Sequence, residues 1–278
     1  MLAHVAESSA YEGKNDRQTC VCGALRMDIP DRIWWVSDFQ DQITPHYYYK
    51  CPNCLSFSAV NLHFEVSSYS HADIHAYHHS EEKRQLNRAR VDWIIESFQG
   101  HMPERPIIFD LGSGEGQFVE CAKALIAEAR ITAVEADERM FDRFSDTYSD
   151  VNLAKEYIED FLANTPDATA DIANLTDVLE HVLDPAALLH ETVRTLRSGG
   201  VAYLTIPDSR SYPDPQPIPA SHVNWSLANQ TRQHLWMMHP KMLFRLVSAE
   251  ADVVEYSRSF EERLRRDSHY STFIVKKH

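Results

Sequence analysis

The chain has 278 residues, which favours one large domain with a small appendage over two domains of equal size. Hydrophobic residues make up 44% and aromatic residues 10%, enough for a buried core, which excludes a disordered chain. Lys and Arg number 27 against 41 Asp and Glu, and the resulting net charge of −14 repels a phosphate backbone, so we expect no nucleic-acid partner.

The beginning of the chain lacks the basic start and the apolar core of a secretory signal. No apolar run approaches the roughly 20 residues that cross a bilayer, so we expect no membrane association. The chain has 5 cysteines, and an odd number without an export signal favours thiols or metal ligands over disulfides. We therefore expect a cytoplasmic protein.

The first 104 residues divide into three parts. Residues 1–18 are polar and small and predict a flexible arm. Residues 19–68 hold four cysteines and many aromatic residues, and residues 69–104 carry a helical pattern that ends at Gly100 and two prolines. We interpret these as a cysteine-rich segment and a helical connector, with the last domain occupying residues 105–278.

In this last domain, short apolar runs alternate with helical patterns. The predicted strands are residues 107–111, 131–135, 151–157, 171–176 and 200–206, with helices near 116–129, 138–147 and 185–197. Strands that alternate with helices predict an α/β fold with a parallel sheet covered on both faces. The runs at 253–260 and 270–276, joined by a charged connection, predict a C-terminal antiparallel hairpin.

The strongest motif is the glycine loop after the first of these strands. Asp110 and Leu111 lead into Gly112, Gly114 and Gly116, and a helix follows. Glycine lets a ligand approach the backbone closely and tolerates positive φ. The nicotinamide fingerprint Gly-x-Gly-x-x-Gly requires glycine at position 117, where the chain has glutamine, so the pattern disfavours that cofactor.

This motif resembles the first motif of the class I S-adenosylmethionine-dependent methyltransferases, an acidic residue followed by Gly-x-Gly-x-Gly. The resemblance implies a Rossmann-like methyltransferase domain with a mostly parallel seven-stranded sheet. It also implies that Asp110 holds the amino end of the methionine moiety and that the glycines line the cofactor. Glu135, at the end of the next predicted strand, matches the acidic residue that binds both ribose hydroxyls, and a carboxylate can accept both hydrogen bonds.

Three further stretches follow in the order typical of this family. Asp160 and Phe161 match the loop where an acidic residue contacts the adenine amine and a neighbour packs on the ring. Residues 177–185, beginning with Asp177 on the cofactor side, follow the fourth strand, and residues 196–200 precede the fifth. The chain departs from the family at Ser198, where proline is usual, and at residues 250–252, which replace the common Ala-Gly-Phe.

The cysteines of the N-terminal segment fall in two close pairs. Cys20 and Cys22 are separated by 28 residues from Cys51 and Cys54, and four thiolates can hold a tetrahedral zinc ion. The spacing of the first pair is tight, so His46 is an alternative ligand, and reduced, packed thiols are the alternative to a metal site. The layout resembles sugar methyltransferases of deoxysugar pathways, which carry an N-terminal zinc-binding module.

Histidines are the candidate catalytic residues. His181 follows the fourth strand, at the end where α/β sheets bind ligands, and His222 and His234 lie in the late segment. An oxygen or carbon nucleophile must lose a proton before methylation, which favours a histidine base and O- or C-methylation. A separate run, His71, His75 and His79, shares one helical face and is interpreted as a solvated surface or a second metal site.

The sequence therefore predicts an S-adenosylmethionine-dependent methyltransferase that acts on a small molecule, such as a sugar nucleotide or another natural-product precursor. Two alternatives stay open at this point. One is an NAD-dependent Rossmann oxidoreductase, and the other is a zinc-bearing interaction protein with a vestigial methyltransferase domain. The sequence identifies neither the methyl acceptor nor the oligomeric state.

Overall fold

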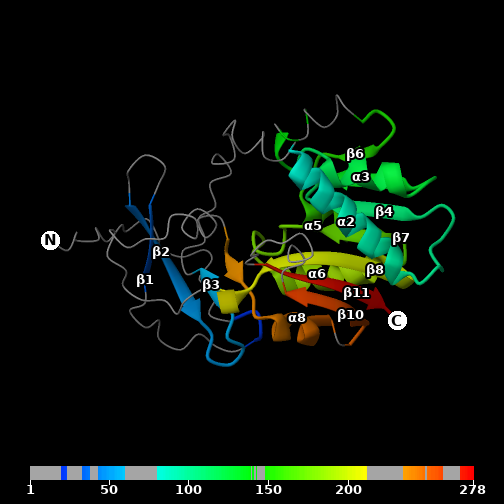
Figure 1. Cartoon of the computed structure of the whole chain (residues 1–278). Helices are drawn as coiled ribbons and strands as arrows, with labels where there is room; N and C mark the ends of the chain where they lie inside the picture. Colours follow the sequence, from blue (N-terminus) through cyan, green and yellow to red (C-terminus); the bar gives the residue numbers. More distant parts are fainter. Residues whose placement is uncertain are drawn as a thin grey trace.

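The computed structural model of the chain describes residues 20–23, 33–37, 43–59, 80–138, 140, 142, 148–211, 234–247, 249–258 and 270–278. In these ranges the backbone forms one seven-stranded sheet and one four-stranded sheet. Figure 1 shows the large sheet with its helices beside the smaller sheet, which lies nearer the N-terminus. His71, His75, His79 and His222 lie outside the described residues.

The large sheet is mostly parallel and ends in an antiparallel hairpin. Its strands are β4 (Ile107–Leu111), β5 (Arg130–Val134), β6 (Asn152–Ala154), β7 (Ala170–Leu175), β8 (Leu196–Pro207), β10 (Ala251–Arg258) and β11 (Tyr270–Lys277). They are ordered β10-β11-β8-β7-β4-β5-β6, and β4 to β8 pair in parallel. Strand β11 pairs antiparallel with both β8 and β10. The seven-stranded Rossmann-like fold expected from the sequence is confirmed.

Helices cover both faces of this sheet (Figure 1). They are α2 (Glu81–Ser97), α3 (Gln117–Leu125), α5 (Ile158–Asn164), α6 (Pro185–Thr195) and α8 (Pro240–Val247). Side chains alternate along each strand, so Ile108 packs under α2 and α3 while Phe109 packs under α5 and α6. No helix in the described ranges combines the length and apolarity needed to cross a membrane.

Several elements have bounds that differ from the sequence prediction. Strand β6 stops at Ala154 because Tyr157 already caps the start of α5. Helix α6 ends at Thr195, and β8 begins at once because Leu196 is already extended and pairs with Ala170. The predicted helix at 138–147 and the first part of the predicted connector lie largely outside the described residues.

The smaller sheet contains one strand from far along the chain. Its strands are β1 (Ile33–Ser37), β2 (Ile43–Lys50), β3 (Phe57–Ala59) and β9 (Trp236–Met237), paired in that order. Strand β9 pairs antiparallel with β3, and the amide of Met238 donates to the carbonyl of Pro207 at the end of β8. The segment at 236–238 therefore links the smaller sheet to the large one.

Candidate functional site: a glycine loop, two carboxylates and a histidine pair

The site lies where the order of the parallel strands reverses. From β4 the chain proceeds outward through β5 and β6, and then returns to place β7 on the other side of β4. At such a reversal the loops after the two central strands separate, and their carboxyl ends form the crevice in which α/β proteins bind ligands. The loops after β4 and β7 carry five of the predicted site residues, namely Gly112, Gly114, Gly116, Asp177 and His181.

Two glycines of the loop after β4 serve different purposes. Gly112 has φ +76°, and a Cβ there would lie 2.8 Å from Cγ2 of Val178, so only glycine lets the two loops touch. Gly114 has φ +53°, and a Cβ there would meet no atom within 4 Å. Gly116, with φ 84°, starts α3. The loop is thus packed on one side and open on the other.

Asp110 is the last polar residue before this loop and is 1% exposed. One carboxylate oxygen accepts a 2.7 Å hydrogen bond from Nδ2 of Asn174 on β7, and no described residue donates to Oδ2. Burial, with a further contribution from the charge of Glu135, raises the pKa of Asp110 to about 7 despite the Asn174 bond. A buried oxygen without a donor favours a cationic ligand group at this position.

Glu135 follows β5 and faces the same loop. Its carboxylate accepts 2.8 Å hydrogen bonds from the amides of Gly114 and Asp137. Burial raises its pKa, and these backbone amides partly offset the effect. Each carboxylate oxygen accepts one bond in this arrangement, and a second lone pair on each stays available for a hydroxyl donor.

Two further predicted cofactor residues, Asp160 and Phe161, lie on α5. Asp160 is exposed on α5, and the ring of Phe161 packs edge-on against Phe109 at 5.1 Å between centroids. It is Ile158, at the start of α5, that lies 3.6 Å from the Cβ position of Gly112. The sequence analysis missed Ile158 because the strand before it was predicted to run to residue 157.

Asp177 stands at the turn after β7 with φ 57°. Its backbone amide donates to Oγ1 of Thr205, and this hydroxyl donates back to the Asp177 carboxylate at 3.0 Å. Burial raises the pKa of Asp177, but the charges of Lys83 and Arg90 and the hydroxyl bond outweigh it, so the pKa lies below its ordinary value. Lys83, on α2, was not anticipated because its contact with the site is set by tertiary packing.

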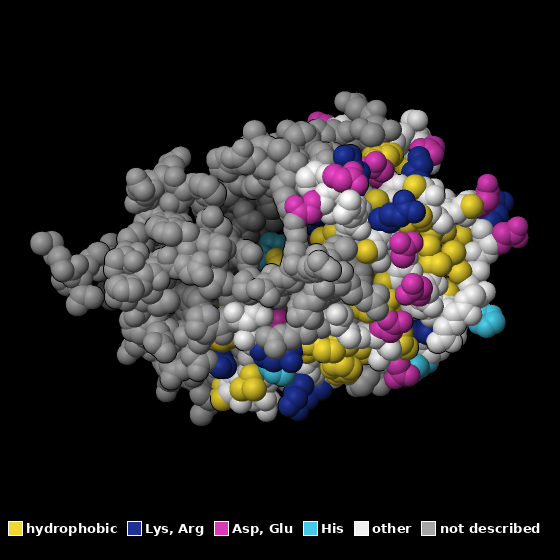
Figure 2. Space-filling view, viewed as in Figure 1, with side chains coloured by type: hydrophobic (Ala, Val, Ile, Leu, Met, Phe, Trp, Pro, Cys, Tyr) yellow, Lys and Arg dark blue, Asp and Glu magenta, His cyan; other side chains and the backbone are white. Residues whose placement is uncertain are grey.

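The structure brings His181 and His234 together. Their ring centroids lie 5.0 Å apart in an edge-on arrangement. The contact is fixed by the backbone, because the amides of Leu235 and Trp236 both donate to the carbonyl of Glu180. The indole of Trp236 also donates to the carbonyl of Val182 at 2.9 Å. Histidine surface is visible in a hollow on the face shown in Figure 2.

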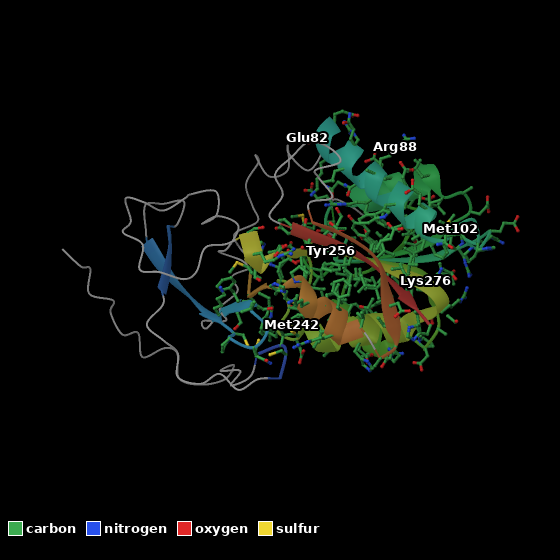
Figure 3. All side chains as sticks on the ribbon, turned by 60° about the horizontal axis from the view of Figure 1, so that its bottom comes forward. Glu82, Arg88, Met102, Met242, Tyr256 and Lys276 are labelled. Atoms are coloured by element: carbon green, nitrogen blue, oxygen red, sulfur yellow. The ribbon has the colours of Figure 1, made fainter. Side chains whose placement is uncertain are left out.

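The four predicted metal ligands of the N-terminal segment also meet. The sulfur atoms of Cys20, Cys22, Cys51 and Cys54 all lie within 4.8 Å of one another. The Cys20 and Cys54 sulfurs are 3.6 Å apart and those of Cys22 and Cys51 are 3.7 Å apart. The cluster packs on Met242 of α8 (Figure 3), and the side chain of His46, the alternative ligand, is not among those that the structure describes.

The sheet order with an antiparallel β11 between β8 and β10 defines the fold of the class I S-adenosylmethionine-dependent methyltransferases. A solved structure of the plantazolicin methyltransferase BamL, bound to a triazolic desmethylPZN analog and SAH, superposes with a TM-score of 0.57. The superposition covers 75% of this chain and 92% of that one at 12% identity, and it supports the fold alone.

Residues 109–204 match the family described as "Methyltransferase domain". This part of the chain is therefore a methyltransferase domain, and the nicotinamide alternative is set aside.

Two relatives have similar sequences. The trans-aconitate 2-methyltransferase of Agrobacterium fabrum (strain C58 / ATCC 33970) is 29% identical over 105 residues, 38% of this chain and 40% of the relative. The ubiquinone biosynthesis O-methyltransferase of Aeromonas salmonicida (strain A449) is 28% identical over 125 residues, 44% of this chain and 50% of the relative. The chain thus spans half or less of the length of the relatives it matches.

The glycine loop generates a prediction with a built-in control. Gly112→Ala should lower the free energy of unfolding by about 2–5 kcal/mol, because left-handed strain adds to the clash with Val178. Gly114→Ala should cost only about 1–2 kcal/mol of strain, yet it should abolish binding of S-adenosylhomocysteine, because the new methyl group fills the open side of the loop.

Denaturant unfolding and titration calorimetry measure the two effects. Gly100→Ala is the matched control, since Gly100 has φ +82° and open space but lies away from the loop. The Gly100→Ala variant should carry a similar backbone strain and bind S-adenosylhomocysteine as the unaltered protein does. Normal binding by the Gly114 variant would show that the ligand does not lie over this loop.

Proposed function

We propose that the protein transfers a methyl group from S-adenosylmethionine to a small molecule. The observation that carries this proposal is the pairing of an open glycine loop with two carboxylates at the strand reversal, the buried Asp110 and the half-buried Glu135. The first offers a buried oxygen that no described residue donates to, and the second offers two spare lone pairs. An ammonium group and a ribose diol donate hydrogen bonds, and these carboxylates supply the acceptors that they need.

In this assignment Asp110 receives the ammonium of the methionine moiety, and Glu135 accepts both ribose hydroxyls. Gly112, Gly114 and Gly116 allow the backbone to approach the cofactor, and Ile158 lies against this loop. Asp177 remains a proposed neighbour of the cofactor. Asp160 and Phe161 remain proposed neighbours of the adenine. The bound cofactor supplies a methyl group activated by a sulfonium. The protein then has to align the nucleophile in line with that bond and to exclude water.

The proposed acceptor is a small molecule with a hydroxyl group or an activated carbon. The two relatives are named for small-molecule methylation, one of them explicitly O-methylation. A sugar nucleotide or another natural-product precursor stays the proposed class. The net charge of −14 opposes nucleic acid, and the described part of the face in Figure 2 mixes acidic with basic side chains.

The organisation of the chain is proposed as stated from the sequence: an arm at 1–18, a zinc-binding segment at 19–68, a connector at 69–104 and the methyltransferase domain from 105 to 278. We place the protein in the cytoplasm, which is consistent with all five of its cysteines being free thiols in the structure. Reduced thiols there stay available to a metal ion.

Cofactor binding should depend on pH through Asp110. With a pKa of about 7, this carboxyl is mostly protonated at pH 6 and mostly ionised at pH 8, and only the ionised form attracts an ammonium group. The affinity for S-adenosylhomocysteine should therefore fall about tenfold from pH 8 to pH 6 in calorimetry. The Asp110→Asn variant should bind more weakly at pH 8 and respond little to pH.

Asp252→Asn is the control, since Asp252 is exposed on β10, and it should keep the pH dependence of the unaltered protein. A protein that binds neither S-adenosylmethionine nor S-adenosylhomocysteine at any pH would contradict the proposed function. It would favour the interaction protein with a vestigial domain.

His181, His234 and His222 are the proposed catalytic histidines, and His181 is the strongest candidate for the base. It is half-buried beside the crevice, whereas His234 is buried and has its pKa lowered mainly by burial. His181→Gln should reduce turnover by about 10²–10⁴ with an acceptor that supports methyl transfer. The affinity for S-adenosylhomocysteine should stay unchanged.

Turnover is measured as transfer of an isotopically labelled methyl group, followed by mass spectrometry. His190→Gln, which alters an exposed histidine of α6, is the control and should retain full turnover. A decrease of less than about tenfold in the His181 variant would show that alignment alone drives the reaction.

The four clustered cysteines are proposed to bind one zinc ion. Elemental analysis of protein purified without chelators should find one cysteine-dependent zinc per chain, which Cys54→Ser should remove. Because zinc binding and folding are coupled locally, this variant should lose structure in the N-terminal segment and still bind S-adenosylhomocysteine. Cys121→Ser, in α3 and away from the cluster, should keep the metal. If freshly purified protein contains no zinc, the proposed zinc site is wrong.

A further inference from the structure

A second group of potential ligands lies inside the methyltransferase domain. One ligand atom each from Glu180, His181 and His234 lies within 4.8 Å of the other two. Glu180 and His181 follow β7, and His234 comes from the segment that the Glu180 carbonyl holds through two backbone hydrogen bonds. The backbone therefore holds the two segments that carry this cluster next to each other.

The carboxylate of Glu180 is the unusual member of the cluster. Its side chain is 0% exposed, and neither of its oxygens accepts a hydrogen bond from any residue that the structure describes. Nε2 of His234 lies 3.9 Å from Oε1 of Glu180, which is too far for a hydrogen bond. A fully buried carboxyl in this position favours a cation as its partner.

The donor set specifies the kind of cation. Two imidazoles and one carboxylate are ligands of divalent transition metals, whereas magnesium and calcium prefer sites made only of oxygen. In a tetrahedral site with bonds of about 2.0–2.2 Å, ligand atoms lie about 3.3–3.6 Å apart. The 3.9 Å between Glu180 and His234 needs only a small side-chain rotation to reach that spacing. Three protein ligands leave a fourth position open for a molecule from outside.

The cluster also lies next to the proposed cofactor loop. Val178, two residues before Glu180, is the side chain that touches the Cβ position of Gly112. His181 is half-buried, whereas Glu180 and His234 are buried, so the cluster has its accessible side at His181. An ion held there would be within reach of a substrate that enters the crevice.

We propose that Glu180, His181 and His234 bind a divalent transition-metal ion that holds the oxygen of the methyl acceptor. This inference rests on the proposed methyl transfer, and it makes His181 a ligand in place of a free base. The metal lowers the pKa of the acceptor hydroxyl, which releases its proton to solvent water. The oxygen then forms a bond to the methyl carbon, the carbon–sulfur bond breaks, and its electron pair turns the sulfonium into a neutral thioether.

Cobalt(II) is the probe, because its visible absorption reports its ligands. The purified protein, with its cysteine site occupied by zinc, should bind one additional cobalt ion per chain in calorimetry and absorption titrations. The spectrum should lack the charge-transfer band that cysteine ligands produce. His181→Ala, Glu180→Gln and His234→Ala should each weaken cobalt binding by more than about 100-fold, since losing even a supporting residue of a metal site costs 10–100-fold. His190→Ala is the control and should bind as the unaltered protein does.

Three results would overturn the inference: no cobalt binding, equal binding by all variants, or a thiolate band that Cys54→Ser removes. Calorimetry with S-adenosylhomocysteine on the same samples checks the fold of each variant. If the variants of the buried residues fail this check, the variant of the half-buried His181 decides alone. If the unaltered protein binds S-adenosylhomocysteine but not cobalt, only the proposed metal site is wrong. If the unaltered protein does not bind S-adenosylhomocysteine, the proposed methyl transfer is wrong.

Discussion

The functional site depends on one packing constraint, the pairing of β4 with β7 in parallel at the point where the strand order reverses. This pairing puts Asp110 directly beside Asn174, whose amide satisfies one of the two buried carboxylate oxygens. It also presses the following loops together, so that Gly112 and Val178 come into contact. A larger residue at position 112 would push these loops apart and separate the carboxylates from the histidines.

A second constraint attaches the cysteine segment to this core. The short strand β9 pairs with β3 on one side. On the other side, the backbone amide of Met238 donates a hydrogen bond to the carbonyl of Pro207 at the end of β8. Phe57 and Trp236 are both 1% exposed and belong to the same core cluster as Phe109. The cysteine cluster lies next to this junction, on α8. Folding of the N-terminal segment and placement of His234 therefore involve the same short stretch of chain.

The sequence predicted features that depend on local pattern. The alternation of apolar strands and helices gave the central sheet, and the glycine motif located the crevice, because backbone conformation at these positions is set by the residues themselves. It could not predict β9, since Trp236 and Met237 are too short a run to show a strand period. It also could not predict the contact between His181 and His234, which depends on two amides of the later segment reaching the Glu180 carbonyl.

The central claim is that the loop after β4 and the carboxylate of Glu135 bind the cofactor of methyl transfer. A crystal structure of the protein grown with S-adenosylhomocysteine tests it most directly. The account predicts that the ribose hydroxyls donate to Glu135, the ammonium reaches the buried oxygen of Asp110, and the ligand lies over Gly114. A ligand bound elsewhere, with Asp110 and Glu135 making the same contacts as they do without it, would contradict the account.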